Sequence, residues 1–221
     1  MVKKEQIIKM TWDEYFVIEL NILGDKVEKY LNENNVKVDV VVPLLRGGNI
    51  PGTYLAYRLN ILKIVPVQYK YFFENGLAEL RQMQKVNEDL FEKDAKMTFL
   101  LVEGNHCFGI SASYAAKGLK KQFPDCEIIY AASNMDYHYQ DVVKDAKASF
   151  YGRLQNSCEE CSEEECKKLG FDYKKYEIFP WENIEEELTT MKMDQFQFSD
   201  MKESKNKSEF CESFDLSDIY S

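Results

Sequence analysis

The chain has 221 residues, of which 45% are hydrophobic, and its formal net charge is −10. This length suits one α/β domain with additional segments. The acidic balance argues against a general nucleic-acid or membrane-surface binder. No apolar run approaches the length of a membrane span and no signal peptide is visible, so we expect a cytoplasmic protein whose six cysteines are reduced thiols.

The N-terminal part of the chain begins with a helix signal, because Thr11 and Glu14 form a capping box ahead of apolar residues at helical spacing. The elements predicted here are a helix, a buried strand, a second helix and a second strand, at 10–31, 38–45, 53–59 and 61–67. A glycine-rich turn, 46–52, separates the first strand from the second helix. The aromatic residues Tyr69, Tyr71, Phe72 and Phe73 are compatible with a continued strand, whereas 74–95 is charged and mildly helical. We expect 68–96 to form a mobile flap or an excursion from the sheet.

The strongest local pattern is a strand, a loop and a helix between Phe99 and Lys121. The apolar run 99–102 is typical of a buried parallel strand, and Glu103 places a carboxylate at its end. The loop 104–109 has a glycine at each end, and Ser111 opens the helical pattern. Open α/β sheets bind ligands at such loops, and the backbone N–H groups of a helix N-terminus favour a phosphate. The pattern therefore predicts a phosphate site.

Two other interpretations of this loop are weaker. The glycine spacing of 104–111 also fits a nucleotide-binding P-loop, but Ile110 stands where that motif needs a lysine. His106 and Cys107 suggest a nucleophile with its base, although neighbours in sequence rarely face each other.

The remaining predicted elements are a strand at 127–133, a short strand at 176–179 and a helix that ends near 191. Cys158, Cys161 and Cys166 lie in an acidic insertion, about 155–170, where a zinc ion would lack a fourth ligand, so structural zinc is not expected. From 192 to 221 the chain is acidic and lacks periodicity, which predicts a disordered tail after a domain at 1–191.

Three separated stretches together resemble the type I phosphoribosyltransferases, most closely the xanthine–guanine (purine) branch. The first is 41–52, VVPLLRGGNIPG, which is similar to the family's pyrophosphate loop. The resemblance implies that Arg46, Gly47 and Gly48 bind pyrophosphate. It also implies a non-proline cis peptide bond between Leu45 and Arg46.

The second stretch is the strand–loop–helix pattern, which resembles the family's phosphoribosyl pyrophosphate motif in a degraded form. The resemblance implies that Glu103 holds the ribose and a magnesium ion, and that Glu103 and Cys107 stand at catalytic positions. The residues implied to bind the 5′-phosphate are Phe108, Gly109, Ile110 and Ser111. Three residues depart from the family pattern: Gly104 replaces a second acid, Cys107 replaces an aspartate near the base, and Phe108 replaces a threonine.

The third stretch is 176–182, YEIFPWE, which resembles the closing motif of the xanthine–guanine branch. In that branch an aromatic ring at the position of Tyr176 stacks on the purine, and Ile178 belongs to the same base site.

The resemblance implies an α/β fold with a central, mainly parallel sheet flanked by helices and a small hood built from the chain ends. It implies transfer of phosphoribosyl from magnesium-bound phosphoribosyl pyrophosphate to a purine base, with activity impaired by the missing acids, in a homo-oligomer. The alternative is a catalytically inert protein of the same fold that binds a phosphate or nucleotide and acts as a regulator or interaction module.

Overall fold

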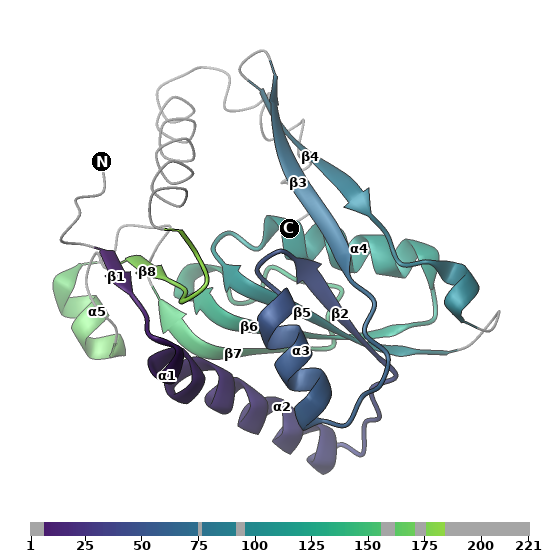
Figure 1. Cartoon of the computed structure of the whole chain (residues 1–221), viewed down its shortest axis with the longest axis horizontal. Helices are drawn as coiled ribbons and strands as arrows, with labels where there is room; N and C mark the ends of the chain where they lie inside the picture. Colours follow the sequence, from purple (N-terminus) through teal and green to yellow (C-terminus); the bar gives the residue numbers. More distant parts are fainter. Residues whose placement is uncertain (1–6, 75–76, 92–95, 156–161, 171–175, 184–221) are drawn as a thin grey trace.

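The computed structural model describes residues 7–74, 77–91, 96–155, 162–170 and 176–183, and it contains two sheets (Figure 1). The strands of the larger sheet are, in spatial order, β4 (Leu77–Gln84), β3 (Val67–Glu74), β2 (Val40–Leu45), β5 (Thr98–His106), β6 (Glu127–Asp136) and β7 (Ala148–Gln155). All neighbouring pairs are parallel except β3–β4. The predicted α/β class and mainly parallel sheet are confirmed.

Helices cover both faces of this sheet. The helical segments are α1 (Trp12–Tyr15), the π-helical η2 (Phe16–Leu20), α2 (Asn21–Glu33), α3 (Asn49–Arg58), the 3₁₀ turns η3 (Glu88–Leu90) and η4 (Tyr137–Tyr139), α4 (Ile110–Gln122) and α5 (Glu163–Leu169). Apolar side chains of α2 and α3 pack with Leu100 and Val102 of β5, whereas those of α4 pack with Phe99 and Leu101. Alternate residues of the apolar strand therefore enter two cores, which is why the run is continuous.

The first helix starts as its sequence predicts. The Thr11 hydroxyl accepts a hydrogen bond from the Glu14 backbone N–H (3.2 Å), and the Glu14 carboxylate accepts one from the Thr11 N–H (2.8 Å). The helix passes through the π-helical turn η2 before α2, and it is tied to the sheet where the hydroxyls of Tyr15 and Ser133 lie 2.6 Å apart.

The region after α3 differs from its prediction. The expected strand at 61–67 does not form. Before Val67, where β3 begins, this segment pairs with the sheet through an isolated bridge between Ile64 and Val41. The helical expectation for 74–95 is wrong over β4, which pairs antiparallel with β3, so that backbone pairing and the packing of Leu80 override the local helical preference. β3 and β4 are the outermost strands on one side of the larger sheet, and Figure 1 shows their hairpin projecting from that side of it. The expected mobility of this segment stays a prediction.

The second sheet is the predicted hood. It joins β1 (Ile7–Lys9) and β8 (Tyr176–Ile178) in parallel, so it is built from segments near both ends of the chain. Aromatic packing fixes it to the first helix, where Tyr15 lies edge-on to Phe179 (ring centroids 5.2 Å apart) and to Trp181 (4.8 Å). An ion pair between Arg153 of β7 and Glu177 of β8 links the two sheets.

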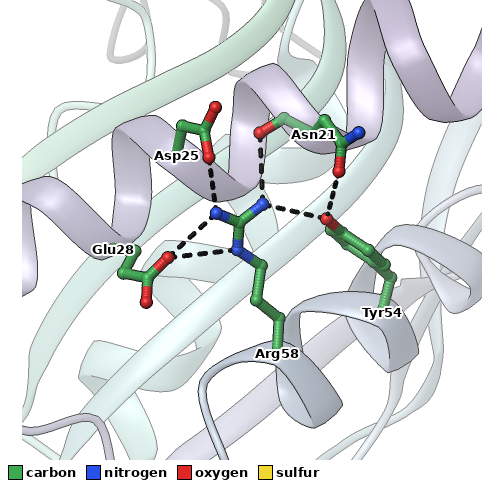
Figure 2. A network of polar contacts seen from close by, with 5 residues as sticks. All are labelled: Asn21, Asp25, Glu28, Tyr54 and Arg58. Carbon is green, nitrogen blue, oxygen red and sulfur yellow. Dashed lines mark hydrogen bonds and ion pairs between the residues drawn. The ribbon is translucent and has the colours of Figure 1, made fainter.

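A polar network fixes α3 on α2 (Figure 2). The Arg58 guanidinium donates to the carboxylates of Asp25 and Glu28, to the Asn21 carbonyl (3.3 Å) and to the Tyr54 hydroxyl (2.9 Å). The Tyr54 hydroxyl in turn donates to the Asn21 side chain at 2.9 Å. Because α3 follows directly after Gly48, this network also anchors the predicted pyrophosphate turn.

Several predictions fall outside the described residues, namely the helix to 191, the tail at 192–221, and Cys158 with Cys161. The domain boundary at 191 stays a prediction. Cys166 is buried in α5 beside Tyr137 and Leu154. In the described part of the chain, no helix is both long and apolar enough to cross a membrane.

Candidate functional site

The predicted pyrophosphate turn lies at the carboxyl end of β2. Leu45 and Arg46 are joined by a cis peptide bond, as the family resemblance implied. The Arg46 side chain is exposed, and the Gly48 N–H donates to the Leu44 carbonyl at 2.8 Å. The turn is shorter than predicted, because α3 begins at Asn49 and not at Thr53.

Close backbone packing places this turn beside the end of β5. A side chain at Gly104 would put its Cβ 2.7 Å from the Gly47 carbonyl oxygen, and one at Gly48 would put its Cβ 2.1 Å from the Val102 carbonyl oxygen. Glycine at positions 48 and 104 therefore allows the two segments to touch. Arg46 follows β2 and Glu103 lies in the last part of β5, and because these neighbouring strands are parallel, both residues are at the carboxyl-terminal end of the sheet.

The loop after β5 is shorter than the sequence suggested. Pairing of Asn105 and His106 with β6 extends the strand past Val102, so only 107–109 connect it to α4. Gly109 precedes the helix at φ 69°, a left-handed conformation that favours glycine. The first intrahelical bond runs from the Ser113 N–H to the Gly109 carbonyl (2.9 Å), so the earlier N–H groups of the turn are available to an anion.

The four predicted phosphate residues therefore differ in what they offer. Phe108 packs edge-on against Tyr139, with ring centroids 5.1 Å apart, and Ile110 is buried. Ser111 is half-buried in the first turn of α4. A phosphate here would be bound mainly by the backbone of 109–111.

Glu103 is the first of three side chains joined in series by hydrogen bonds, an arrangement that the sequence did not reveal. Its Oε2 lies 2.9 Å from the Tyr130 hydroxyl, and the same hydroxyl lies 2.7 Å from His106 Nδ1. His106 Nε2 lies 2.9 Å from the Tyr139 carbonyl oxygen, which can only accept, so this nitrogen carries a hydrogen. We name this set the Glu103–Tyr130–His106 file.

In a neutral His106 ring Nδ1 can only accept, and an ionised Glu103 can also only accept, but the Tyr130 hydroxyl between them has a single hydrogen. One more proton, on Glu103 or on His106, is therefore needed to complete both hydrogen bonds. Burial raises the pKa of Glu103 to about 7, against the hydrogen bond from Tyr130, which lowers it. Burial also lowers the pKa of His106 to about 4, against the Tyr139 carbonyl and Asp136. The carboxyl group is therefore the better holder of the extra proton, and the imidazole is neutral at neutral pH.

Cys107, the other predicted catalytic residue, is half-buried in the loop. Its thiol donates to the Asn105 side chain (3.5 Å), and the Gln155 amide donates to Asn105 (2.7 Å) and to Asn134 (3.1 Å). The His106 ring is turned into the core, so the structure gives no support to a nucleophile and base at 106–107. The amide groups were missed because nothing in their local sequence marks them.

A second buried polar group lies where the hood meets the larger sheet. Glu19 is wholly buried, and neither of its carboxylate oxygens has a hydrogen-bond partner among the described residues. Burial and the charge of Glu177 raise its pKa to about 8, while Arg153 and Asn134 act in the opposite direction. The burial of Glu19 was not predicted. A single acid among the apolar residues of an amphipathic helix is expected on the exposed face.

The predicted base residues lie in the hood. Tyr176 is the first residue of β8, and its side chain lies outside the described part of the structure. The Ile178 side chain is buried and its carbonyl accepts from the Met10 N–H at 3.0 Å. The base-binding roles of both residues stay predictions.

Searches against protein-family models and against curated protein sequences find no match. Solved structures do match. A purine phosphoribosyltransferase from Pyrococcus horikoshii has a TM-score of 0.56 and 18% identity, over 81% of this chain and 95% of that one. A xanthine-guanine-hypoxanthine phosphoribosyltransferase from Helicobacter pylori has a TM-score of 0.55 and 15% identity, over 83% and 99%. A hypothetical protein from Neisseria gonorrhoeae with bound ppGpp has a TM-score of 0.57 and 18% identity, over 81% and 90%.

These identities are low, so the comparison concerns the fold, and the coverage shows that most of this chain takes part in it. The parallel sheet, the glycine turn after β2, the loop into α4 and the hood form the framework in which the predicted site residues lie. The chain therefore has the fold of the type I phosphoribosyltransferases, as purine enzymes of that family do.

Proposed function

We propose that this protein binds phosphoribosyl pyrophosphate and transfers its phosphoribosyl group slowly to a purine base. The observation that carries the proposal is the backbone approach of Gly47 to Gly104, which brings the turn after Arg46 against the residue that follows Glu103. A guanidinium and a helix N-terminus at one sheet edge offer sites for two phosphate groups. The Glu103 carboxylate offers an acceptor for ribose hydroxyls.

Each group would have a distinct role in the reaction. Arg46 and the backbone of 47–48 would bind the pyrophosphate and stabilise its charge as it departs. The N–H groups of 109–111 would hold the 5′-phosphate, and Glu103 would orient the ribose. Tyr176 would stack on the base. Catalysis would come from positioning and charge stabilisation, because Cys107 replaces the residue that assists proton transfer.

A magnesium ion would bind at this site mainly through the diphosphate group of the ligand. Within the described residues no three His, Cys, Asp or Glu side chains are grouped to hold a metal ion. Magnesium bound to a diphosphate needs only one or two carboxylates, and Glu103 would be the protein ligand. Since its pKa lies near 7, Glu103 is partly ionised at neutral pH, and a cation would favour the ionised form. Bound magnesium would supply charge neutralisation of the diphosphate.

The test is a turnover assay with phosphoribosyl pyrophosphate, magnesium and each of guanine, xanthine, hypoxanthine and adenine. We expect nucleoside monophosphate at a rate far below the enzyme median of about 10 per second, because general acid–base help of about 10²–10⁴-fold is missing. The Glu103→Gln variant should be slower still. Brisk turnover would contradict impairment, and no product with any base would contradict transferase activity.

The inert binding protein remains the second candidate, and one observation favours it. Gly104 stands where the family has a second acid, and the Gly47 carbonyl leaves no room for a side chain there. An inert protein would bind phosphoribosyl pyrophosphate or a nucleotide in calorimetry while giving no product in the assay.

A further inference from the structure

The Glu103–Tyr130–His106 file connects Glu103 in the candidate site with two buried side chains of the sheet. Tyr130 and His106 are buried, with exposures of 0% and 1%, whereas Glu103 is half-buried within β5. Within the described chain, the one hydrogen bond of the Glu103 carboxylate is that of Oε2 with Tyr130. Oε1 is therefore left for a ligand.

The inner end of the file is held on two sides. The Tyr139 carbonyl fixes His106 Nε2, as described above. The ring also lies against Gly109, where an added Cβ would come within 2.5 Å of His106 Cε1 and 2.6 Å of Nε2. Glycine at 109 is therefore needed for two reasons: it allows the turn into α4, and it leaves space for the His106 ring. The His106 ring therefore packs directly against the loop that would bind the 5′-phosphate.

We propose that Tyr130 and His106 are positioning residues that aim Glu103 at the two ribose hydroxyls of the ligand. This inference rests on the proposed function. When Glu103 is protonated it donates to the Tyr130 hydroxyl, which donates to His106 Nδ1, and when Glu103 is ionised the hydroxyl donates to Oε2. In both states the contact with Tyr130 holds the carboxyl group in one orientation. The file thereby replaces the support that a second acid at position 104 cannot provide.

The test uses two nucleotides that differ only in the hydroxyls concerned, guanosine 5′-monophosphate and its 2′,3′-dideoxy form. Wild type should bind the first more tightly. Tyr130→Phe keeps the ring and removes the hydroxyl, and it should weaken the first by about tenfold, the scale of one lost bond to a charged group, while leaving the dideoxy form unchanged. Tyr69→Phe is the matched control, because it removes a hydroxyl that donates to the Tyr114 carbonyl (3.2 Å).

A wild-type measurement covers the case in which the variant fails to fold. The chain has two histidines, His106 and His138, so ¹⁵N spectra of the imidazoles are simple. The hydroxylated nucleotide should shift the His106 ring signals beyond the shift that the dideoxy form produces, and His138, which contacts Asp136 (3.0 Å), serves as reference.

The possible outcomes distinguish the positioning role of Tyr130 and His106 from the proposed function. Equal affinity of wild type for the two nucleotides, or equal loss of both in Tyr130→Phe, would overturn the positioning role. If wild type binds neither nucleotide nor phosphoribosyl pyrophosphate, the proposed function fails and the positioning role fails with it.

Discussion

The contact between Gly47 and Gly104 is asymmetric, and this asymmetry matters for any attempt to restore the family motif. A Cβ on Gly104 would lie 2.7 Å from the Gly47 carbonyl oxygen, but one on Gly47 would lie no closer than 3.5 Å to Gly104. The first distance is too short for any side chain, whereas the second is an ordinary contact. Gly104→Asp would therefore displace the turn that it is meant to complete.

We predict that Gly104→Ala lowers the free energy of unfolding by about 1–3 kcal/mol, the scale of an overpacking change, and weakens pyrophosphate binding. Gly47→Ala is the matched control and should change stability by less than about 1 kcal/mol. Urea unfolding and pyrophosphate titration of both variants measure these effects. Equal behaviour of the two variants would show that the backbone contact does not govern the turn.

The buried acid Glu19 predicts a pH dependence of stability. Its folded pKa of about 8 lies above the ordinary value of 4.5, so the folded state keeps a proton that the unfolded chain releases between these values. Stability should therefore fall as pH rises from about 4.5 to 8, by up to about 1.4 kcal/mol per pH unit from this group.

Glu19→Gln removes this titration, so its stability relative to wild type should rise steadily between pH 5 and pH 8. Urea unfolding at several pH values measures the difference. Glu33→Gln, at an exposed acid paired with Lys29, serves as the control and should follow the wild-type profile. Parallel profiles for Glu19→Gln and wild type would mean that Glu19 is ionised throughout this range.

Residues in the candidate site were predictable where the local sequence carries the signal. Arg46 with its two glycines and Glu103 after an apolar run stand out because strand ends and turns are local features. Tyr130 and His106 did not, because their role depends on a contact across 24 positions of the chain. A tyrosine inside an apolar strand has the sequence appearance of core.

At the scale of elements, the α2–α3 junction depends on Arg58. The side chain is 22% exposed, and its hydrogen bonds reach three residues of α2 and one of α3. The backbone of Gly24 makes room for it, because a Cβ there would lie 2.4 Å from a guanidinium nitrogen. One arginine thus fixes the helix that carries the pyrophosphate turn.

Arg58→Met should lower the free energy of unfolding by about 1–3 kcal/mol, because two carboxylates and the partly buried Asn21 carbonyl and Tyr54 hydroxyl lose a charged donor. Lys29→Met, which removes an exposed i,i+4 pair with Glu33 (3.8 Å), should cost at most about 0.5 kcal/mol. Thermal and urea unfolding of the two variants provide the comparison. A loss no greater than that of Lys29→Met would mean that α3 is held by apolar packing alone.

Element types followed from sequence wherever burial is continuous or the cap is local. The capping box, β2, β5 and β6 were all predicted, because apolar runs and caps act within a few residues. The second strand of the β3–β4 hairpin was not, because 74–95 has no strand pattern of its own and β4 takes its form from pairing with β3. The strand ends were also longer than predicted, since polar residues such as Asn105 pair with neighbours that the sequence does not reveal.

For the molecule as a whole, the fold was accessible from the order of its elements and from the family resemblance. The strand β8 was predicted from its sequence, but its place in a hood was predicted only through the resemblance, because β1 and β8 are three residues each and come from distant parts of the chain. Low identity to the solved structures leaves the reaction to experiment, since one fold serves many functions.

The most direct measurement is calorimetry of phosphoribosyl pyrophosphate binding, with and without magnesium, to wild type, Arg46→Ala and Lys37→Ala. Lys37 is the control because it is an exposed cation that precedes β2, at the opposite end of the strand from Arg46. We expect one saturable site in wild type and in Lys37→Ala, strengthened by magnesium and weakened by about 1.5–3 kcal/mol in Arg46→Ala. No binding to wild type under either condition, or equal affinity in Arg46→Ala, would contradict the account.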